Sequence, residues 1–167
     1  VAGGVAAGSY TLTSELYDPV AGTWAAGGAM TYSHYASQST DWNMTRLNDG
    51  KVLLAGGYAY INASLNGPTP YAELYDPTPN TWALTGSMKV TRWGHAQLKL
   101  DNGKILIAGG YSAYAGGISL RFAEIYDPTA GTFSFTAAMN VARTFLSATK
   151  LVNGLALLAG GYSFTAT

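Results

Sequence analysis

The two histidines, His34 and His95, are the side chains in this sequence best suited to catalysis or metal binding. They lie 61 residues apart, and the chain has no cysteine to complete a metal site, form a disulfide or act as a nucleophile. The Gly-x-Ser-x-Gly turn that usually carries a serine nucleophile is also missing from the sequence. We therefore predict no catalytic residue, no metal site and no cofactor.

Charge and hydropathy argue against two classes of partner. Nine Lys and Arg residues balance nine Asp and Glu residues, and charged residues make up only 11% of the chain. A nucleic-acid binder needs a basic face to neutralise phosphates, and a membrane-surface protein needs a polybasic patch. No apolar run approaches the ~20 residues of a membrane-spanning helix. We expect no nucleic-acid and no membrane partner, and a weakly charged surface that favours self-association.

A repeat runs through the chain, with Gly-Gly pairs beginning at positions 3, 56, 109 and 160. Each unit has an apolar run before Gly-Gly, then a Glu-(Leu/Ile)-Tyr-Asp-Pro block, then an aromatic residue, then a Met. The blocks begin at Glu15, Glu73 and Glu124, the aromatic residues are Trp24, Trp82 and Phe133, and the methionines are Met30, Met88 and Met139. Four features in one order, three times over, indicate an internal structural repeat.

Each unit predicts four short strands, which we letter a to d. Strand a leads into Asp49-Gly50, Asn102-Gly103 or Asn153-Gly154, pairs that favour a type I′ hairpin turn. Strand b is the apolar run before Gly-Gly, and its apolar character on both faces suits a layer packed between two others. Strand c is the Glu-x-Tyr segment, Asp-Pro turns the chain, and strand d carries the aromatic residue. The expected fold class is all-β, built from four-stranded meanders.

This order of features resembles the kelch repeat, in the bacterial variety with Ala-Glu-Leu-Tyr-Asp-Pro and Leu-x-Ala-Gly-Gly phrasing. The resemblance covers nearly the whole chain, and the period fits kelch better than the shorter WD40 repeat. It implies a kelch-type β-propeller with three four-stranded blades in this chain and strand a innermost. Galactose oxidase is a distant relative by this resemblance, but its copper site needs a Tyr–Cys cross-link that a Cys-free chain cannot form.

The expected organisation is a single propeller segment over residues 1–167, with units at about 5–57, 58–110 and 111–161. The terminal half-blades are expected at 1–30 and 142–161, and together they make the third blade. Three blades are fewer than the usual four to eight of a ring. Two chains could exchange half-blades to close a six-bladed homodimer, or the chain could be part of a longer one. Open-ended stacking into a filament is the least favoured alternative.

The repeated acids and arginines are best explained as structural. Glu15, Glu73, Glu124 and the Asp of each block recur in every unit, whereas a single functional site needs an asymmetric arrangement. Arg92 and Arg143 each follow a Met by four residues, where the first unit has His34. We expect the arginines to tie adjacent blades together through hydrogen bonds to loop carbonyls or acids.

The non-repeated aromatic and amide residues predict a binding face. The kelch resemblance implies that the d-to-a and b-to-c loops emerge on the same side, and both carry such residues. Flat rings stack on a partner, while amides and hydroxyls add directional hydrogen bonds. The alternative is that the rings only cover blade edges. The candidate ligand-binding residues are Tyr32, Tyr35, Trp42, Tyr58, Tyr60, Asn62, Tyr71, Tyr111 and Tyr114.

These observations rank three functions. The first is a non-catalytic binding or scaffold module, extracellular or at the cell surface, that recognises a protein or a glycan. The second is a structural subunit that self-assembles by strand pairing. The third is an enzyme with a site in the central channel, which the small number of acids and histidines disfavours. Fold alone does not decide among them.

Overall fold

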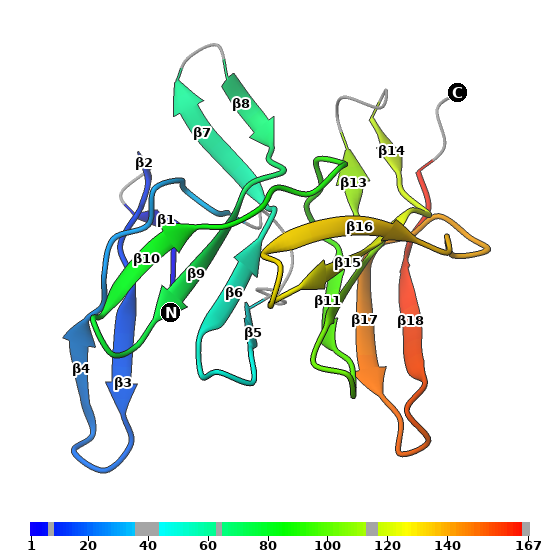
Figure 1. Cartoon of the computed structure of the whole chain (residues 1–167). Coiled ribbons are helices and arrows are strands. Elements are labelled where there is room, and N and C mark those ends of the chain that lie inside the picture. The colour runs from blue at the N-terminus through cyan, green and yellow to red at the C-terminus, as the bar shows by residue number, and fades with distance from the viewer. Residues whose placement is uncertain (7–8, 36–43, 63–64, 113–116, 165–167) are drawn as a thin grey trace.

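Two four-stranded antiparallel sheets form the centre of the molecule (Figure 1). The computed structural model describes residues 1–6, 9–35, 44–62, 65–112 and 117–164. Blade A contains β5 (Met44–Arg46), β6 (Val52–Ala55), β9 (Ala72–Asp76) and β10 (Thr81–Leu84), paired in that order. Blade B contains β11 (Ala96–Lys99), β12 (Ile105–Ala108), β15 (Ala123–Asp127) and β16 (Thr132–Thr136), also paired in that order. Both confirm the predicted a–b–c–d meander.

The elements of the third expected blade lie at the two ends of the chain as separate pairs. β3 (Glu15–Asp18) pairs with β4 (Thr23–Ala26), and β17 (Thr144–Lys150) pairs with β18 (Ala156–Tyr162). By their place in the repeat, β3 and β4 are strands c and d of one blade, and β17 and β18 are strands a and b of another. Two complete blades and two half-blades therefore make up the described residues.

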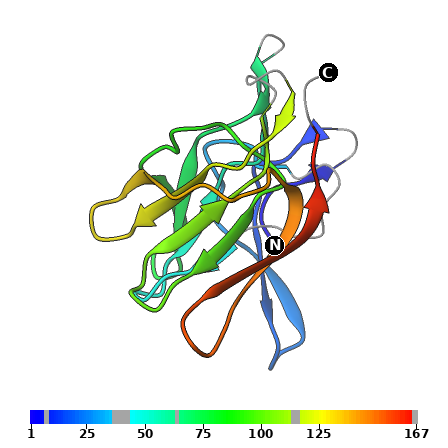
Figure 2. The same cartoon turned by 90° about the vertical axis from the view of Figure 1, so that its right-hand side faces the viewer.

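The b-to-c connections contain hairpins that the sequence analysis missed, because it treated them as loops of variable length. These hairpins pair β1 (Val5–Ala6) with β2 (Ser9–Tyr10), β7 (Tyr58–Asn62) with β8 (Leu65–Pro68), and β13 (Tyr111–Ser112) with β14 (Ile118–Ser119). The β7–β8 and β13–β14 hairpins project from one side of the sheets, whereas the turns of β3–β4 and β17–β18 project from the opposite side (Figure 1). The turned view in Figure 2 shows the same separation for β13–β14 and β17–β18.

The a-to-b turns are tight, but they are not the type I′ turns that we predicted. The Leu47 amide donates to the Lys51 carbonyl over 2.8 Å, and the Gly50 amide donates back to the Leu47 carbonyl over 3.3 Å. Gly50 has a φ of 90°, whereas the two preceding residues do not enter the positive-φ region. This is a three-residue loop with glycine in the left-handed position, which type I hairpins with a bulge use. The same bonds recur around Gly103 and Gly154.

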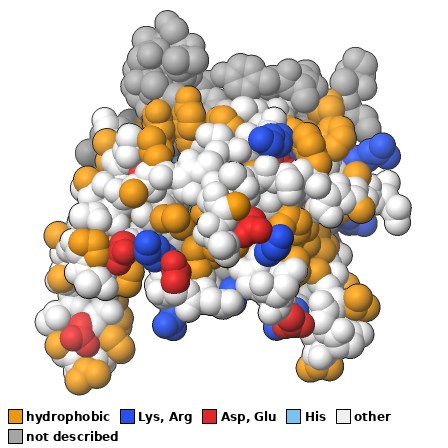
Figure 3. Space-filling model, in the orientation of Figure 1, with side chains coloured by type: hydrophobic (Ala, Val, Ile, Leu, Met, Phe, Trp, Pro, Cys, Tyr) orange, Lys and Arg blue, Asp and Glu red, His pale blue; other side chains and the backbone are white. Residues whose placement is uncertain are grey.

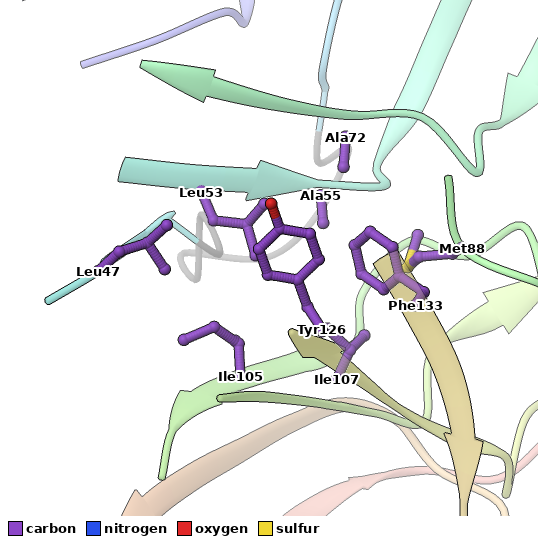
Figure 4. Packing of buried hydrophobic residues seen from close by; sticks show 9 residues of the cluster. All are labelled: Leu47, Leu53, Ala55, Ala72, Met88, Ile105, Ile107, Tyr126 and Phe133. Atoms are coloured by element: carbon purple, nitrogen blue, oxygen red, sulfur yellow. The ribbon is translucent and has the colours of Figure 1, made fainter. Parts of the chain in front are cut away.

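The largest hydrophobic core lies between the two blades (Figure 4). Tyr126 and Phe133 of blade B point toward Leu53 and Ala55 of blade A, and all four side chains are buried. Burying a side chain of this size stabilises a fold by about 1.5–3 kcal/mol. Packing of one blade face on the next therefore explains why strand b is apolar on both sides. The full cluster comprises Leu47, Leu53, Ala55, Ala72, Met88, Ile105, Ile107, Tyr126 and Phe133.

The repeated acids have structural roles, as predicted. The Asp76 carboxylate accepts a hydrogen bond from the Thr78 amide at 3.0 Å, and Asp127 accepts one from the Thr129 amide at 2.9 Å. These bonds hold the c-to-d turns. The side chain of Glu124 is fully buried, and its carboxylate accepts hydrogen bonds from main-chain amides of the d-to-a loop. Each of these carboxylates is thus engaged in hydrogen bonds that hold a turn or a loop.

Candidate functional site

The d-to-a loops meet the b-to-c hairpins on one face of the molecule, as the kelch resemblance implied. Tyr35 and Tyr58 exchange main-chain hydrogen bonds of 2.9 and 2.7 Å. Trp93 and Tyr111 make the same exchange in the next unit, at 3.2 and 2.8 Å. Each of these four residues carries an aromatic side chain, so the backbone pairing brings rings from distant parts of the sequence together.

Five aromatic residues gather around Trp93, and we call the six rings together the Trp93 cluster. The Trp93 ring makes edge-on contacts with Tyr58, Tyr111 and Phe145, at centroid distances of 6.2, 5.7 and 5.3 Å. Tyr162 and Phe164 extend the group, and their side chains are 67% and 47% exposed. The cluster thus runs from a half-buried centre to an exposed edge. Its members are Tyr58, Trp93, Tyr111, Phe145, Tyr162 and Phe164.

The centre of the cluster holds a hydrogen-bond donor without an acceptor. The Trp93 indole Nε1 is buried and has no hydrogen-bond partner within the described part of the chain. A buried indole N–H normally finds an acceptor, and leaving it unpaired costs free energy. An oxygen atom of a bound partner would remove that cost.

Two tyrosine groups continue the aromatic surface toward the first unit. Tyr10 meets Tyr35 edge-on at 5.5 Å, while Tyr32 stacks on Tyr71 at 4.2 Å with an angle of 9° between the rings. Burial, followed by the nearby hydroxyls of Tyr58 and Tyr35, raises the pKa of Tyr10. Tyr10 therefore stays a neutral hydrogen-bonding group. Figure 3 shows hydrophobic side chains spread over one face of the molecule, with acidic and basic side chains lying together mainly in its lower half.

Buried ionic contacts hold the loops that carry these rings. Arg92 is fully buried and donates to Glu124 at 2.7 Å and to the carbonyls of Gly109 and Phe122 at 2.8 and 2.9 Å. Met88, on the same loop, donates its amide to the Pro70 carbonyl of blade A at 2.9 Å. The loop is therefore fastened to both blades. Arg92 binds loop carbonyls and an acid as predicted, but these acceptors all lie in blade B, and the bond to blade A comes from Met88. Trp93 follows Arg92 directly, so this tie positions the indole.

No model of a protein family matches the sequence. An F-box/kelch-repeat protein of Arabidopsis thaliana is 31% identical over 117 residues, which are 70% of this chain and 30% of the relative. A second F-box/kelch-repeat protein of that plant is 30% identical over 99 residues, 56% of this chain and 28% of the relative. The solved structure of YjhT, a kelch-type propeller, matches with a TM-score of 0.60 at 14% identity, over 75% of this chain and 44% of YjhT.

These likenesses agree with the repeat and with the two complete four-stranded sheets. The chain is made of kelch-type β-propeller blades. The kelch chain spans less than a third of the length of these two curated relatives and less than half of YjhT. The comparisons therefore identify the fold and the repeat, while the site has to be argued from its geometry.

The kelch blades bring together only part of the predicted site. Tyr58 and Tyr111 lie in the Trp93 cluster, Tyr35 adjoins Tyr58, and Tyr32 stacks on Tyr71 beside them. Tyr60 and Asn62 lie in strand β7, where the structure describes the backbone but not these side chains. Trp42 and Tyr114 lie outside the described residues. Contact between these nine candidates and a ligand stays a prediction.

The sequence analysis missed the centre of this kelch face. Trp93, Phe145, Tyr162 and Phe164 were not among the candidates. A signal for Trp93 was present, because Trp93 follows Met88 by five residues, as the candidate Tyr35 follows Met30. Phe145 offered no such signal, since the corresponding residue of blade B is Gly94. Only the structure shows that Phe145 lies against the loop that carries Trp93.

The described residues were also searched for other kinds of site. They contain no group of three or more His, Cys, Asp or Glu side chains that could hold a metal ion. They also contain no helix long and apolar enough to cross a membrane.

Proposed function

We propose that this chain is a non-catalytic interaction module that binds a protein partner through the Trp93 cluster and the adjoining tyrosines. The observation that carries the proposal is the convergence on one face of aromatic rings from several loops, hairpins and strand ends that are far apart in the sequence. Aromatic residues are enriched where proteins bind each other, because they bury a large area with few rotatable bonds. The occurrence of kelch repeats in F-box/kelch-repeat relatives supports a protein partner.

A glycan is the alternative partner of the same face. Aromatic rings stack on sugars as well as on peptides, and the low charge of the chain suits a neutral ligand. The unpaired indole N–H of Trp93 could serve either partner. An extracellular or cell-surface location, in which glycans are common, stays a prediction.

A binding selection with matched variants tests the proposal. The protein is screened against a phage-displayed peptide library and a printed panel of neutral and acidic glycans, and the best binders are titrated. Tyr162→Ala and Phe164→Ala should weaken these binders about tenfold or more, as expected of interface anchors. Phe135→Ala is the control, because Phe135 is an equally exposed ring on β16 (58%) that lies outside the cluster.

The outcome also separates the two partners. Peptides that depend on Tyr162 and Phe164 support the protein partner, and sugars that depend on them support the glycan. Binders that respond to Phe135→Ala as strongly as to the cluster variants would contradict the proposal, and so would the absence of any cluster-dependent binder.

Self-assembly is the second candidate, because two repeat contacts lack their partners in the described residues. Strands β6 and β12 each pair with a strand c, whereas β18 pairs only with β17. Arg143 donates to the Gly160 carbonyl at 2.8 Å, like Arg92 to Gly109, but it meets no carboxylate. Glu15, which occupies the equivalent acid position on β3, meets no arginine. Arg143 of one copy could therefore pair with Glu15 of another.

The N-terminal residues oppose this exchange. Val1 accepts the Glu15 amide at 2.8 Å and Ala2 bridges Ser14, so residues 1–2 already lie where the end of an incoming strand b would pair. Beside them is a cavity of about 150 Å³ lined by Leu16, Met44 and Trp82, among others. An exchanged β18 would have to displace residues 1–4 and fill this cavity.

Light scattering over a dilution series tests the self-assembly. A stable mass of twice 17.4 kDa that Glu15→Arg abolishes, and that Glu15→Arg with Arg143→Glu restores, would support the exchange. A monomer at all concentrations would contradict it, without bearing on the aromatic face.

A further inference from the structure

The three repeat units do not all carry the same residue at one equivalent position. This position follows the unit's Met by four residues and is occupied by His34, Arg92 and Arg143. In blade B, Arg92 is a permanent cation that meets Glu124 on strand c. In blade A, His34 takes its place and meets Glu73, the equivalent acid. An imidazole can lose its charge at physiological pH, whereas a guanidinium cannot.

The contacts of His34 require a proton on both ring nitrogens. Nδ1 lies 2.6 Å from the Gly56 carbonyl oxygen, and Nε2 lies 3.3 Å from a Glu73 carboxylate oxygen. A carbonyl and an ionised carboxylate only accept hydrogen bonds, so both nitrogens have to donate. The side chains of His34 and Glu73 are 1% and 0% exposed, so water cannot replace either contact. The geometry is therefore that of a buried imidazolium–carboxylate pair.

The same carboxylate holds the backbone of the loop. Glu73 accepts the Thr31 amide at 2.8 Å and the Tyr32 amide at 2.9 Å. Burial alone would raise the pKa of Glu73, but the hydrogen bond from His34, the two amides and the histidine charge outweigh it and lower the pKa. Beside the charged imidazole, Glu73 is therefore held in its ionised form. Tyr32 and Tyr35, at the two sides of His34, belong to the candidate binding face.

We propose that His34 makes the Thr31–Tyr35 segment pH-sensitive, ordered while the imidazole is charged and loosened when it becomes neutral. A neutral ring can donate to only one of its two partners. Its other nitrogen then faces an acceptor, and the buried Glu73 charge loses its cation. The stabilisation is therefore present at low pH and is lost as the pH rises through the histidine titration. Blade B does not change, since Arg92 keeps its charge.

The other ionisable groups near this pair do not titrate in the same range. His95 lies on the far side of Gly56, where its ring is 3.0 Å from the place a side chain on that glycine would occupy. Burial, then the charge of Arg92, lowers the pKa of His95 to about 3, against a weak opposing effect of the Ala55 carbonyl. The Arg92 guanidinium itself points to Glu124.

The pH effect on the order of the Thr31–Tyr35 segment requires no ligand. A pH effect on binding rests in addition on the proposed function. If both hold, binding that uses Tyr32 or Tyr35 weakens as the pH rises, and binding confined to Phe145, Tyr162 and Phe164 does not.

Amide hydrogen exchange of the free protein tests the proposal with an internal control. The Thr31 and Tyr32 amides donate to Glu73, and the Lys89 and Val90 amides donate to Glu124 in the equivalent loop. The ratio of protection factors between the two pairs removes the intrinsic effect of pH on exchange. We expect protection of Thr31 and Tyr32, relative to Lys89 and Val90, to fall about tenfold or more between about pH 5.5 and about pH 8.5.

His34→Arg is the matched variant, because an arginine there would find the equivalents of all the acceptors that Arg92 uses. Its protection ratio should not change with pH, and the ¹⁵N shifts of the His34 ring in the natural protein should follow the same transition as the ratio. A ratio that stays constant in the natural protein would overturn the proposal, and this result does not depend on whether the variant folds. Because no ligand is used, the result leaves the proposed binding function to its own test.

Discussion

Replacing Arg92 with alanine should lower the free energy of unfolding by about 3–5 kcal/mol, as expected when one partner of a buried ion pair is removed. The substitution takes away three hydrogen bonds, to Glu124, Gly109 and Phe122, none longer than 2.9 Å. The Glu124 charge remains fully buried, with only the amides of Lys89 and Val90 to stabilise it. A loss of this size is a large part of the ~5–15 kcal/mol that stabilises a typical domain.

Arg143→Ala is the control for this prediction. Arg143 occupies the equivalent position but is only half-buried, and within the described residues its side chain makes one hydrogen bond, to the Gly160 carbonyl, without a carboxylate partner. Its loss should cost only about 0.5–1.5 kcal/mol. Urea titration followed by tryptophan fluorescence measures both variants, and Arg92→Lys, which keeps the charge without the planar fork, should fall between them. Equal losses for Arg92→Ala and Arg143→Ala would refute the reasoning that the buried carboxylate dominates.

Two further predictions concern the packing between blades. Burial lowers the pKa of His95 to about 3, so the unfolded chain takes up a proton that the folded one refuses, and stability falls as the pH drops from about 6.5 toward 3. In that range, proton uptake by His95 on unfolding makes the free energy of unfolding change by about 1.4 kcal/mol per pH unit. His95→Gln should remove this contribution to the slope. An unchanged slope would contradict the low pKa of His95. Gly109 and Gly160 are equivalent glycines with φ values of 69° and 73°, but a side chain on Gly109 would lie 2.5 Å from the Arg143 carbonyl whereas one on Gly160 meets nothing within 4 Å. Gly109→Ala should therefore destabilise the protein more than Gly160→Ala by about 1–3 kcal/mol in thermal unfolding, and equal effects would mean that backbone strain alone decides.

The strands were predictable because each is set by a local pattern. Val52–Ala55 and Ile105–Ala108 are apolar throughout and end in Gly-Gly, and both became strand b. The type of the a-to-b turn was not predictable in the same way. Asp49-Gly50 suits a two-residue turn, but the pairing of Leu47 with Lys51 takes Asn48 into the loop. That register depends on how strands a and b align in the sheet, which two residues cannot specify.

The candidate face was predicted in outline and missed at its centre. Tyr58 and Tyr111 were chosen because they stand in variable connections, and they do lie in the Trp93 cluster. Trp93 itself stands one residue after a structural arginine and looked like part of the repeat. The main chain of Trp93 pairs with that of Tyr111, which is 18 residues further along the sequence. This pairing brings the β13–β14 hairpin to the loop, and the Trp93 ring therefore lies among the other rings.

The sequence by itself determined the repeat, the all-β class, the four strands of each unit and the structural role of the recurring acids. These features follow from short patterns, because neighbouring residues in the sequence determine which faces of a strand are apolar and where a turn has its glycine. Only the tertiary structure decided which aromatic rings meet and which cation faces which carboxylate. The His34–Glu73 and Arg92–Glu124 pairs join residues 39 and 32 positions apart, and their burial comes from the packing of whole loops against blades. Because burial and hydrogen-bond geometry set the consequences of charge, the same position in the repeat pairs an arginine with a buried carboxylate in one blade and a histidine with one in the other.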